Sequence, residues 1–188
     1  MNYKIVTEAS VDMPENFAKE NDITILPIEV NFNGELYPEG LPNDEFYAKM
    51  KSTGIIPKTS QPNQYKFETA LTPYCNKEDW FVLAIVISSN LAGTIAQAKN
   101  AVEALNMKNV YICDSQVTTF AEGALIMEIV KFIKEKDRKP QEVIDELERL
   151  KSKIKLIAVI SDLKYLKQGG RISGAAAALG TVLGVKPI

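Results

Sequence analysis

Short apolar runs alternate with helical patterns along this chain, and this alternation limits the possible folds more than any other feature. The runs are mostly β-branched: "YKIV" (3–6), "FVLAIVI" (81–87), "NVYIC" (109–113) and "KLIAVI" (155–160). Such runs are typical of strands that are buried on both faces of a parallel sheet. Between them, apolar stripes with helical spacing follow Gly93 and Pro140. We therefore predict an α/β fold with an open, mostly parallel sheet flanked by helices.

One segment departs from this pattern. Residues 25–40, "ILPIEVNFNGELYPEG", alternate apolar and polar side chains and contain Asn33-Gly34. An Asn-Gly pair between alternating residues is a strong signal for a tight β-hairpin turn. We expect an extended arm or hairpin here.

Composition limits the function classes. The net charge is −2 and no histidine is present, so a self-contained Ser-His-Asp or Cys-His site is excluded. No basic run suggests a nucleic-acid partner, and no apolar stretch approaches the roughly 20 residues that cross a bilayer. "MNYKIVTEAS" lacks the apolar run of a secretory signal, so we expect a cytoplasmic protein with two reduced cysteines.

Each predicted strand is followed by polar residues. These are Thr7, Glu8 and Ser10; Ser88, Ser89 and Asn90; Asp114 and Ser115; and Ser161 and Asp162. Ligands of open α/β sheets bind beyond the carboxyl ends of the strands, although turns and helix caps also need such residues. For 88–94 we favour a site, because two adjacent hydroxyls exceed what one cap requires.

Two further stretches are candidates for anion binding. "KTSQP" (58–62) puts Thr59 and Ser60 close to the predicted start of a helix at Gln61-Pro62, where backbone N–H groups attract anions. An ordinary Ser/Thr cap is the alternative interpretation. "LKQGGRISG" (166–174) holds Arg171 behind two glycines, and a guanidinium can bind a carboxylate through two hydrogen bonds.

Nucleotide-binding motifs are absent, since neither G-x-x-x-x-G-K-[ST] nor G-x-G-x-x-G occurs. An enzyme remains the second hypothesis. It would be an α/β phosphotransferase or hydrolase that uses Asp114, Asp162 and Lys164 with a divalent metal.

Several of these stretches together resemble the DegV family of bacterial fatty-acid-binding proteins. "IVTEASVDMP", "TSQP", "ISSNLAGT", "DS" and "DLKYLKQGGRIS" occur in the order of that family and cover nearly the whole chain. The resemblance implies a Rossmann-like N-terminal domain over 1–163 and, over 164–188, only the beginning of a second α/β lid domain.

The resemblance also implies a carrier and not a catalyst, with no cofactor or metal. Family members hold one long-chain fatty acid, such as palmitate, and present its carboxylate to a fatty acid kinase, whose acyl phosphate enters phospholipid synthesis. No nucleic acid and no stable membrane insertion are expected. The carboxylate would be held by hydroxyls and one arginine: Thr59, Ser60, Ser88, Ser89, Thr94 and Arg171.

Three departures from the family pattern stand out. Glu8-Ala9 replaces Asp-Ser, and Ala92 replaces a serine, so the hydroxyls of two serines are absent here. The family also continues beyond "LGVKPI" with the rest of the lid domain, including a histidine near the carboxylate. We therefore expect a truncated form, in which the acyl tunnel is open on one side.

Overall fold

The computed structural model describes residues 1–37, 42–160 and 162–172. The chain forms two compact units: residues 1–28 with 61–156, and residues 29–60 with those from 157 onwards. The predicted domains, 1–163 and 164–188, do not coincide with these two units. They stay a prediction. Ser161 and the last part of the predicted lid domain, 173–188, lie outside the described residues.

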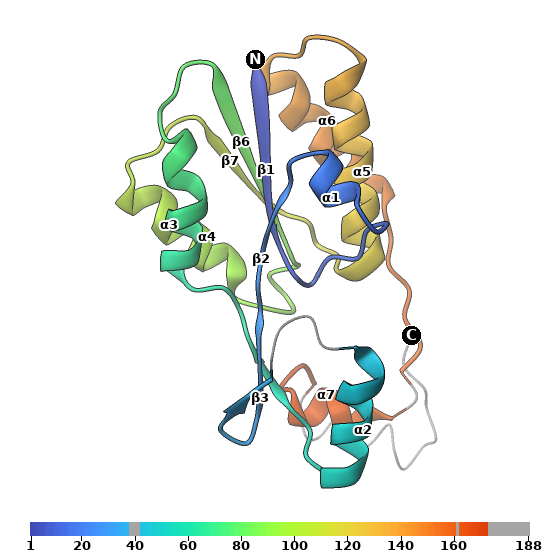
Figure 1. Ribbon diagram of the computed structural model, residues 1–188. Coiled ribbons are helices and arrows are strands. Elements are labelled where there is room, and N and C mark those ends of the chain that lie inside the picture. Colours follow the sequence, from blue (N-terminus) through green and yellow to red (C-terminus); the bar gives the residue numbers. More distant parts are fainter. Residues whose placement is uncertain (38–41, 161, 173–188) are drawn as a thin grey trace. The chain divides into compact units, whose positions relative to one another are not determined.

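A four-stranded parallel sheet forms the centre of the first unit (Figure 1). Its strands are β1 (Asn2–Glu8), β2 (Thr24–Leu26), β6 (Trp80–Val86) and β7 (Val110–Asp114), in the order β2-β1-β6-β7. Three of the predicted strands are confirmed as β1, β6 and β7; the apolar runs of β1 and β6 are mostly buried, whereas β7, at the edge of the sheet, is half-buried apart from the buried Cys113. The predicted α/β class with a mostly parallel sheet is confirmed as well.

Helices cover both faces of this sheet (Figure 1). Alternate residues of β6 point to opposite faces, so Val82 and Val86 pack with one helix pair, and Leu83 and Ile85 pack with the other. The first pair is α3 (Gln64–Leu71), followed by the short helix η1 (Thr72–Tyr74), and α4 (Thr94–Ala104). The second is α5 (Thr119–Glu135) and α6 (Pro140–Lys153), with α1 (Phe17–Glu20) on the same side. The two predicted apolar stripes are thus confirmed as α4 and α6.

The second unit contains an antiparallel sheet and two helices. Strands β3 (Glu29–Phe32), β4 (Glu35–Leu36) and β5 (Lys58–Ser60) lie in the order β4-β3-β5, and α2 (Asn43–Thr53) and α7 (Leu163–Gln168) are its helices. The predicted hairpin is confirmed. Its turn residues Asn33 and Gly34 have φ angles of 54° and 101°, values that asparagine and glycine tolerate best.

The fourth predicted strand, 155–160, is wrong. This segment follows α6 without forming a strand of the described chain, and Ile157 and Val159 are 74% and 68% exposed. An apolar run becomes a strand only where neighbouring strands satisfy its backbone groups, and none of the described strands pairs with this one.

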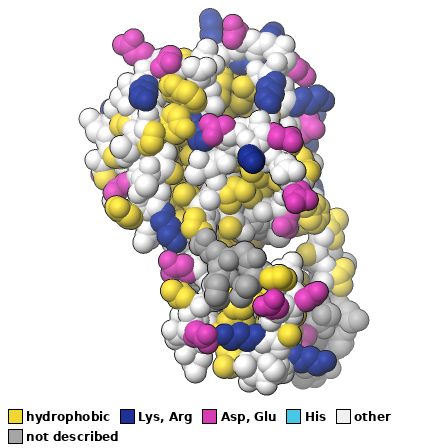
Figure 2. Space-filling model, viewed as in Figure 1, with side chains coloured by type: hydrophobic (Ala, Val, Ile, Leu, Met, Phe, Trp, Pro, Cys, Tyr) yellow, Lys and Arg dark blue, Asp and Glu magenta, His cyan; other side chains and the backbone are white. Residues whose placement is uncertain are grey.

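The surface agrees with the near-zero net charge. On the face drawn in Figure 2, lysine and arginine side chains are intermixed with aspartate and glutamate. Among the described residues, none of the helices combines the length and the hydropathy that a membrane crossing requires.

Candidate functional site

The chain makes a tight turn shortly after β6, and Ser88 is its first residue, since the Leu91 N–H donates to the Ser88 carbonyl at 2.9 Å. Ser88 is only 4% exposed. Its N–H donates to the Val117 carbonyl at 2.9 Å, and its Oγ accepts a hydrogen bond from the Asn90 N–H at 3.3 Å. No acceptor for the Ser88 hydroxyl proton is found among the described residues, so this proton can be donated to a ligand.

Ser88 lines a cavity of about 370 Å³ in the first unit. Hydroxyl, amide and ammonium groups surround it together with apolar side chains: Ser88, Asn90, Leu91, Gln116, Val117, Lys151, Ile154, Lys155 and Leu156. Lys151 also forms an ion pair with Glu148 at 3.0 Å. A cavity of this composition can accept an anionic head group, because hydrogen-bond donors and positive charge meet in it.

Ser89 is exposed and faces the neighbouring strand. Its N–H donates to Asp114 Oδ1 at 3.1 Å, and the Gln116 N–H donates to the same oxygen at 3.1 Å. Burial acts to raise the pKa of Asp114, but the Ser89 side chain, the two N–H groups and the charge of Lys151 together outweigh it and lower the pKa of this carboxyl. Ser89 is therefore held by a carboxylate at the end of β7.

Thr94 begins α4 and is fully buried. Its Oγ1 donates to Glu8 Oε2 at 2.7 Å, and the Ile87 N–H donates to Glu8 Oε1 at 3.0 Å. The hydroxyl of Thr94, a predicted site residue, thus donates its hydrogen bond to a carboxylate of the protein itself. Glu8, at the end of β1, connects both ends of the 87–94 segment to the sheet.

A second buried carboxylate, Glu122 on α5, lies close to Glu8 and has no exposed surface. It accepts hydrogen bonds from Thr7 Oγ1 at 3.4 Å and from Ser10 Oγ at 3.3 Å. Burial, with the charge of Glu8 as the second cause, raises the pKa of Glu122 to about 8. Burial also raises the pKa of Glu8, against the effect of its two hydrogen bonds.

Glu122 is not among the site residues predicted from the sequence, because a glutamate within a helix is usually solvated. A signal was available in the pattern. Glu122 interrupts the apolar stretch 120–127, "FAEGALIM", and stands beside Gly123 on the face that packs against the sheet.

The other three predicted residues belong to the second unit. Thr59 and Ser60 are exposed in β5, where Thr59 pairs with Val30 and Ser60 pairs with Glu29 of β3. Arg171 follows α7, is exposed, and donates to the Gly169 carbonyl. Their roles stay predictions.

The predicted helix start at Gln61-Pro62 is wrong by a few residues. Helix α3 begins at Gln64, and Asn63 caps it by accepting from the Lys66 N–H at 3.0 Å. Gln61 serves the neighbouring segment, because its Oε1 accepts from the Gly93 N–H at 2.8 Å. The N-cap of α3 is thus Asn63, which was not considered as a cap from the sequence.

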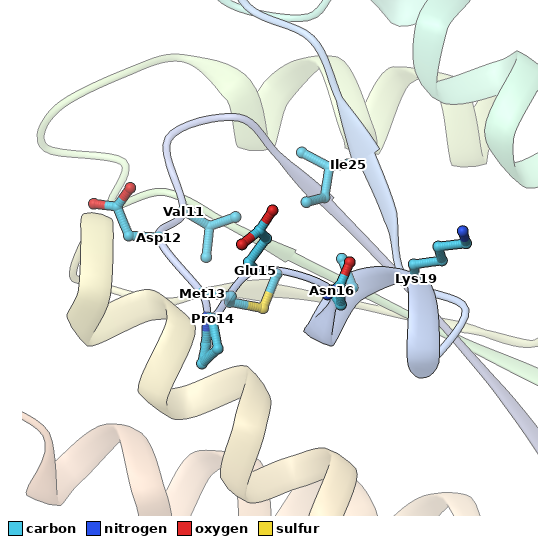
Figure 3. A pocket seen from close by; sticks show the side chains of 9 residues that line it. Val11, Asp12, Met13, Pro14, Glu15, Asn16, Lys19 and Ile25 are labelled. Atoms are coloured by element: carbon cyan, nitrogen blue, oxygen red, sulfur yellow. The ribbon is translucent and has the colours of Figure 1, made fainter. Parts of the chain in front are cut away.

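The loop after β1 encloses a separate hollow of about 380 Å³, shown in Figure 3. Its lining comes from residues 11–19 and from Ile25 of β2, and includes Met13, Pro14 and Glu15. None of the six predicted site residues lines it. We assign it no role in binding.

The residues of the enzyme hypothesis have structural partners. Asp114 holds the Ser89 and Gln116 amides, and Asp162 caps α7 and pairs with Lys164 at 3.0 Å. Within residues 1–37, 42–160 and 162–172, no group of three histidine, cysteine or acidic side chains could hold a metal ion.

Comparison with known protein families identifies the family to which this chain belongs. The profile described as "Uncharacterised protein, DegV family" matches residues 2–188. The chain belongs to the DegV family. Protein DegV of Bacillus subtilis is 32% identical over 190 residues, which are all of this chain and 67% of that protein.

Solved DegV structures share the fold. The fatty-acid-binding DegV family protein of Thermus thermophilus is 29% identical with a TM-score of 0.82, and the match covers 100% of this chain and 66% of that one. The Fak B3 protein of Streptococcus pneumoniae, solved with linoleic acid, has a TM-score of 0.76 over 95% of this chain and 64% of its own. At 18% identity, that likeness concerns the fold alone. This DegV chain spans about two thirds of the length of these relatives.

Proposed function

We propose that this chain binds one long-chain fatty acid and presents its carboxylate to a fatty acid kinase, acting as a carrier and not as a catalyst. The observation that carries the proposal is its similarity, along its whole length, to a DegV protein that binds fatty acid. The family resemblance implies that the kinase then makes acyl phosphate for phospholipid synthesis, and we propose that the chain acts in the cytoplasm.

The affinity would come mainly from the tail. Burial of one methylene contributes about 0.8 kcal/mol, so a 16-carbon tail contributes on the order of 12 kcal/mol before ordering costs. The head group needs hydrogen bonds, because an unpaired polar group buried in protein costs several kcal/mol.

The hydroxyls supply those hydrogen bonds in this proposal. Ser88 has a proton to donate, and the two lysines that line its cavity provide the countercharge in the first unit. Ser89, and Thr59, Ser60 and Arg171 of the second unit, are proposed as further ligands of the carboxylate. Thr94 is proposed to contribute through its position at the start of α4.

A single substitution tests this assignment. Ser88→Ala removes the donor, and we expect palmitate affinity, measured by isothermal titration calorimetry, to fall about ten- to hundredfold, because a hydrogen bond to a charged group is worth about 1.5–3 kcal/mol. Ser152→Ala is the matched control, since this exposed hydroxyl only bonds the Arg149 carbonyl within α6. Equal affinity in both variants would contradict the role of Ser88.

A further inference from the structure

The turn after β7 has a backbone conformation that its residue types do not favour. Among the described residues, seven that are not glycine have a φ angle in the left-handed region. Five of them are asparagine or aspartate, which tolerate this region. The other two, Gln116 and Thr119, lie between β7 and the first turn of α5. Backbone strain of this kind is concentrated where proteins bind ligands, so each of the two residues needs an explanation.

The conformation of Thr119 has a structural explanation. Its N–H donates to the Ser10 carbonyl at 2.9 Å, and its carbonyl accepts from the Asp12 N–H at 3.2 Å. Thr119 thus connects α5 to the loop after β1. Within the described part of the chain, Gln116 forms only a local hydrogen bond, from its N–H to Asp114 Oδ1 at 3.1 Å. Its φ angle of 61° therefore does not result from a contact with another element.

The two neighbours of Gln116 fix this conformation. Ser115 and Val117 are buried, with 1% and 7% of their surface exposed. Ser115 Oγ donates to the Val117 carbonyl at 3.1 Å and accepts from the Val117 N–H at 3.3 Å. The same Val117 carbonyl accepts from the Ser88 N–H at 2.9 Å. Gln116 is thus an exposed residue between two buried ones, and the turn that presents it also holds Ser88.

Gln116 lines the cavity of about 370 Å³ that contains Ser88. No hydrogen-bond partner for its side-chain amide is found among the described residues, so two N–H donors and one carbonyl acceptor are available. Of the nine described residues that line the cavity, Lys151 and Lys155 are basic and none is acidic. Asn90 carries the other amide of this lining, but its φ angle lies outside the left-handed region, so no strain distinguishes it.

We propose that Gln116 is a further ligand of the fatty acid carboxylate, and that its side-chain amide donates to the same carboxylate as the hydroxyl of Ser88. This assignment rests on the proposed function. The left-handed turn directs the amide to the cavity, since an extended or right-handed backbone at this position would point the side chain elsewhere. The strain at Gln116 is thus part of the binding site.

A strained ligand residue and a structural residue respond differently to glycine. Gln116→Gly removes the amide and relieves the backbone, because glycine adopts positive φ angles freely. We expect the Kd for palmitate, measured by isothermal titration calorimetry, to rise about ten- to hundredfold, as for the loss of a hydrogen bond to a charged group. The Tm should stay the same or rise. Gln116→Asn keeps an amide and tolerates the same conformation, so its Kd should lie between those of the glycine variant and the unmodified chain.

A charge variant tests the direct contact. Gln116→Glu keeps the length of the side chain but replaces the donor with a carboxylate that repels the ligand, so Kd should rise more than in Gln116→Gly. Gln141→Glu is the matched control. Gln141 is exposed at the start of α6, about 15 Å along the helix from Lys151, and its amide donates to Asp145 at 2.7 Å. At this distance salt screens the added charge, so Kd should stay within about twofold of the unmodified chain.

The outcomes separate this proposal from the proposed function. If the unmodified chain binds palmitate, and Gln116→Glu binds it with the same Kd as Gln141→Glu, this proposal alone fails. If neither the unmodified chain nor the control binds palmitate, the proposed function fails and the assignment of Gln116 fails with it. A lower Tm in Gln116→Gly with an unchanged Kd would give Gln116 a structural role only, and would overturn the proposal.

Discussion

At the scale of single residues, the first unit uses its carboxylates as acceptors for backbone and hydroxyl donors. Glu8 holds Ile87 and Thr94, and Asp114 holds Ser89 and Gln116. Glu8 lies at the end of β1, and Asp114 lies at the end of β7. Both hold residues of the segment that follows β6. This arrangement leaves Ser88 as the hydroxyl with a proton to donate at this edge of the first unit.

Glu122 should make the stability of the chain depend on pH. Its pKa is raised in the folded state, so the folded chain binds more protons than the unfolded chain between about pH 4.5 and pH 8. The free energy of unfolding should therefore be highest below this window and fall by a few kcal/mol as the pH rises through it. Chemical denaturation at pH 5, 7 and 9 measures this.

The comparison with two variants assigns the effect. Glu122→Gln should flatten the pH dependence and stabilise the chain at pH 9, whereas Glu128→Gln should leave it unchanged. An equally steep fall in stability for Glu122→Gln would place its origin in another group.

Only part of the candidate site could be predicted from the sequence. Ser88 and Ser89 were recognisable because two hydroxyls directly follow an apolar run. The partner of Thr94 was not, since the contact with Glu8 spans 86 positions and arises only from strand order. Glu122 was missed because a glutamate within a helix is usually solvated, although it interrupts an apolar stretch.

At the scale of elements, α5 and the loop after β1 approach each other unusually closely. A Cβ atom built on Gly123 would lie 1.9 Å from the Asp12 carbonyl oxygen, so only glycine fits. Two hydrogen bonds accompany this approach, from the Thr119 N–H to the Ser10 carbonyl at 2.9 Å and from the Asp12 N–H to the Thr119 carbonyl at 3.2 Å.

Gly123→Ala should therefore destabilise the chain by about 1–3 kcal/mol, the typical cost of overpacking. Helix propensity alone predicts the opposite sign, since alanine is favoured over glycine by roughly 1 kcal/mol within a helix. Thermal unfolding decides the sign, with Glu128→Ala on the exposed side of α5 as the control. A rise in Tm for Gly123→Ala would show that the loop can move away at little cost.

Element types followed from the sequence where local pattern and environment agree. Strands β1, β6 and β7 and helices α4 and α6 were predictable because their apolar residues are indeed buried. Residues 155–160 are equally apolar, but none of the described strands pairs with them. An apolar run in the sequence does not show whether a neighbouring strand will pair with it. The start of α3 was misplaced because Ser60, Gln61 and Asn63 are all reasonable residues before a helix.

At the scale of the whole molecule, the proposed carrier function makes tail length the main determinant of affinity. Two additional methylenes contribute about 1.6 kcal/mol, which corresponds to roughly tenfold in Kd. In a series of saturated acids from 10 to 16 carbons, we expect Kd to fall about tenfold for every two carbons added, until the apolar site is filled. Calorimetry at constant pH measures this, and the same Kd across the series would indicate recognition of the carboxylate alone.

Whether the chain carries a fatty acid is measured by extracting the freshly purified chain with organic solvent and quantifying free fatty acids by mass spectrometry. A parallel extract of the Ser88→Ala variant, prepared identically, shows whether the retained acid depends on the proposed site. We expect about one long-chain fatty acid per folded chain, and less in the variant. A folded chain that carries no fatty acid, and takes up none when palmitate is added, would contradict the proposed carrier function.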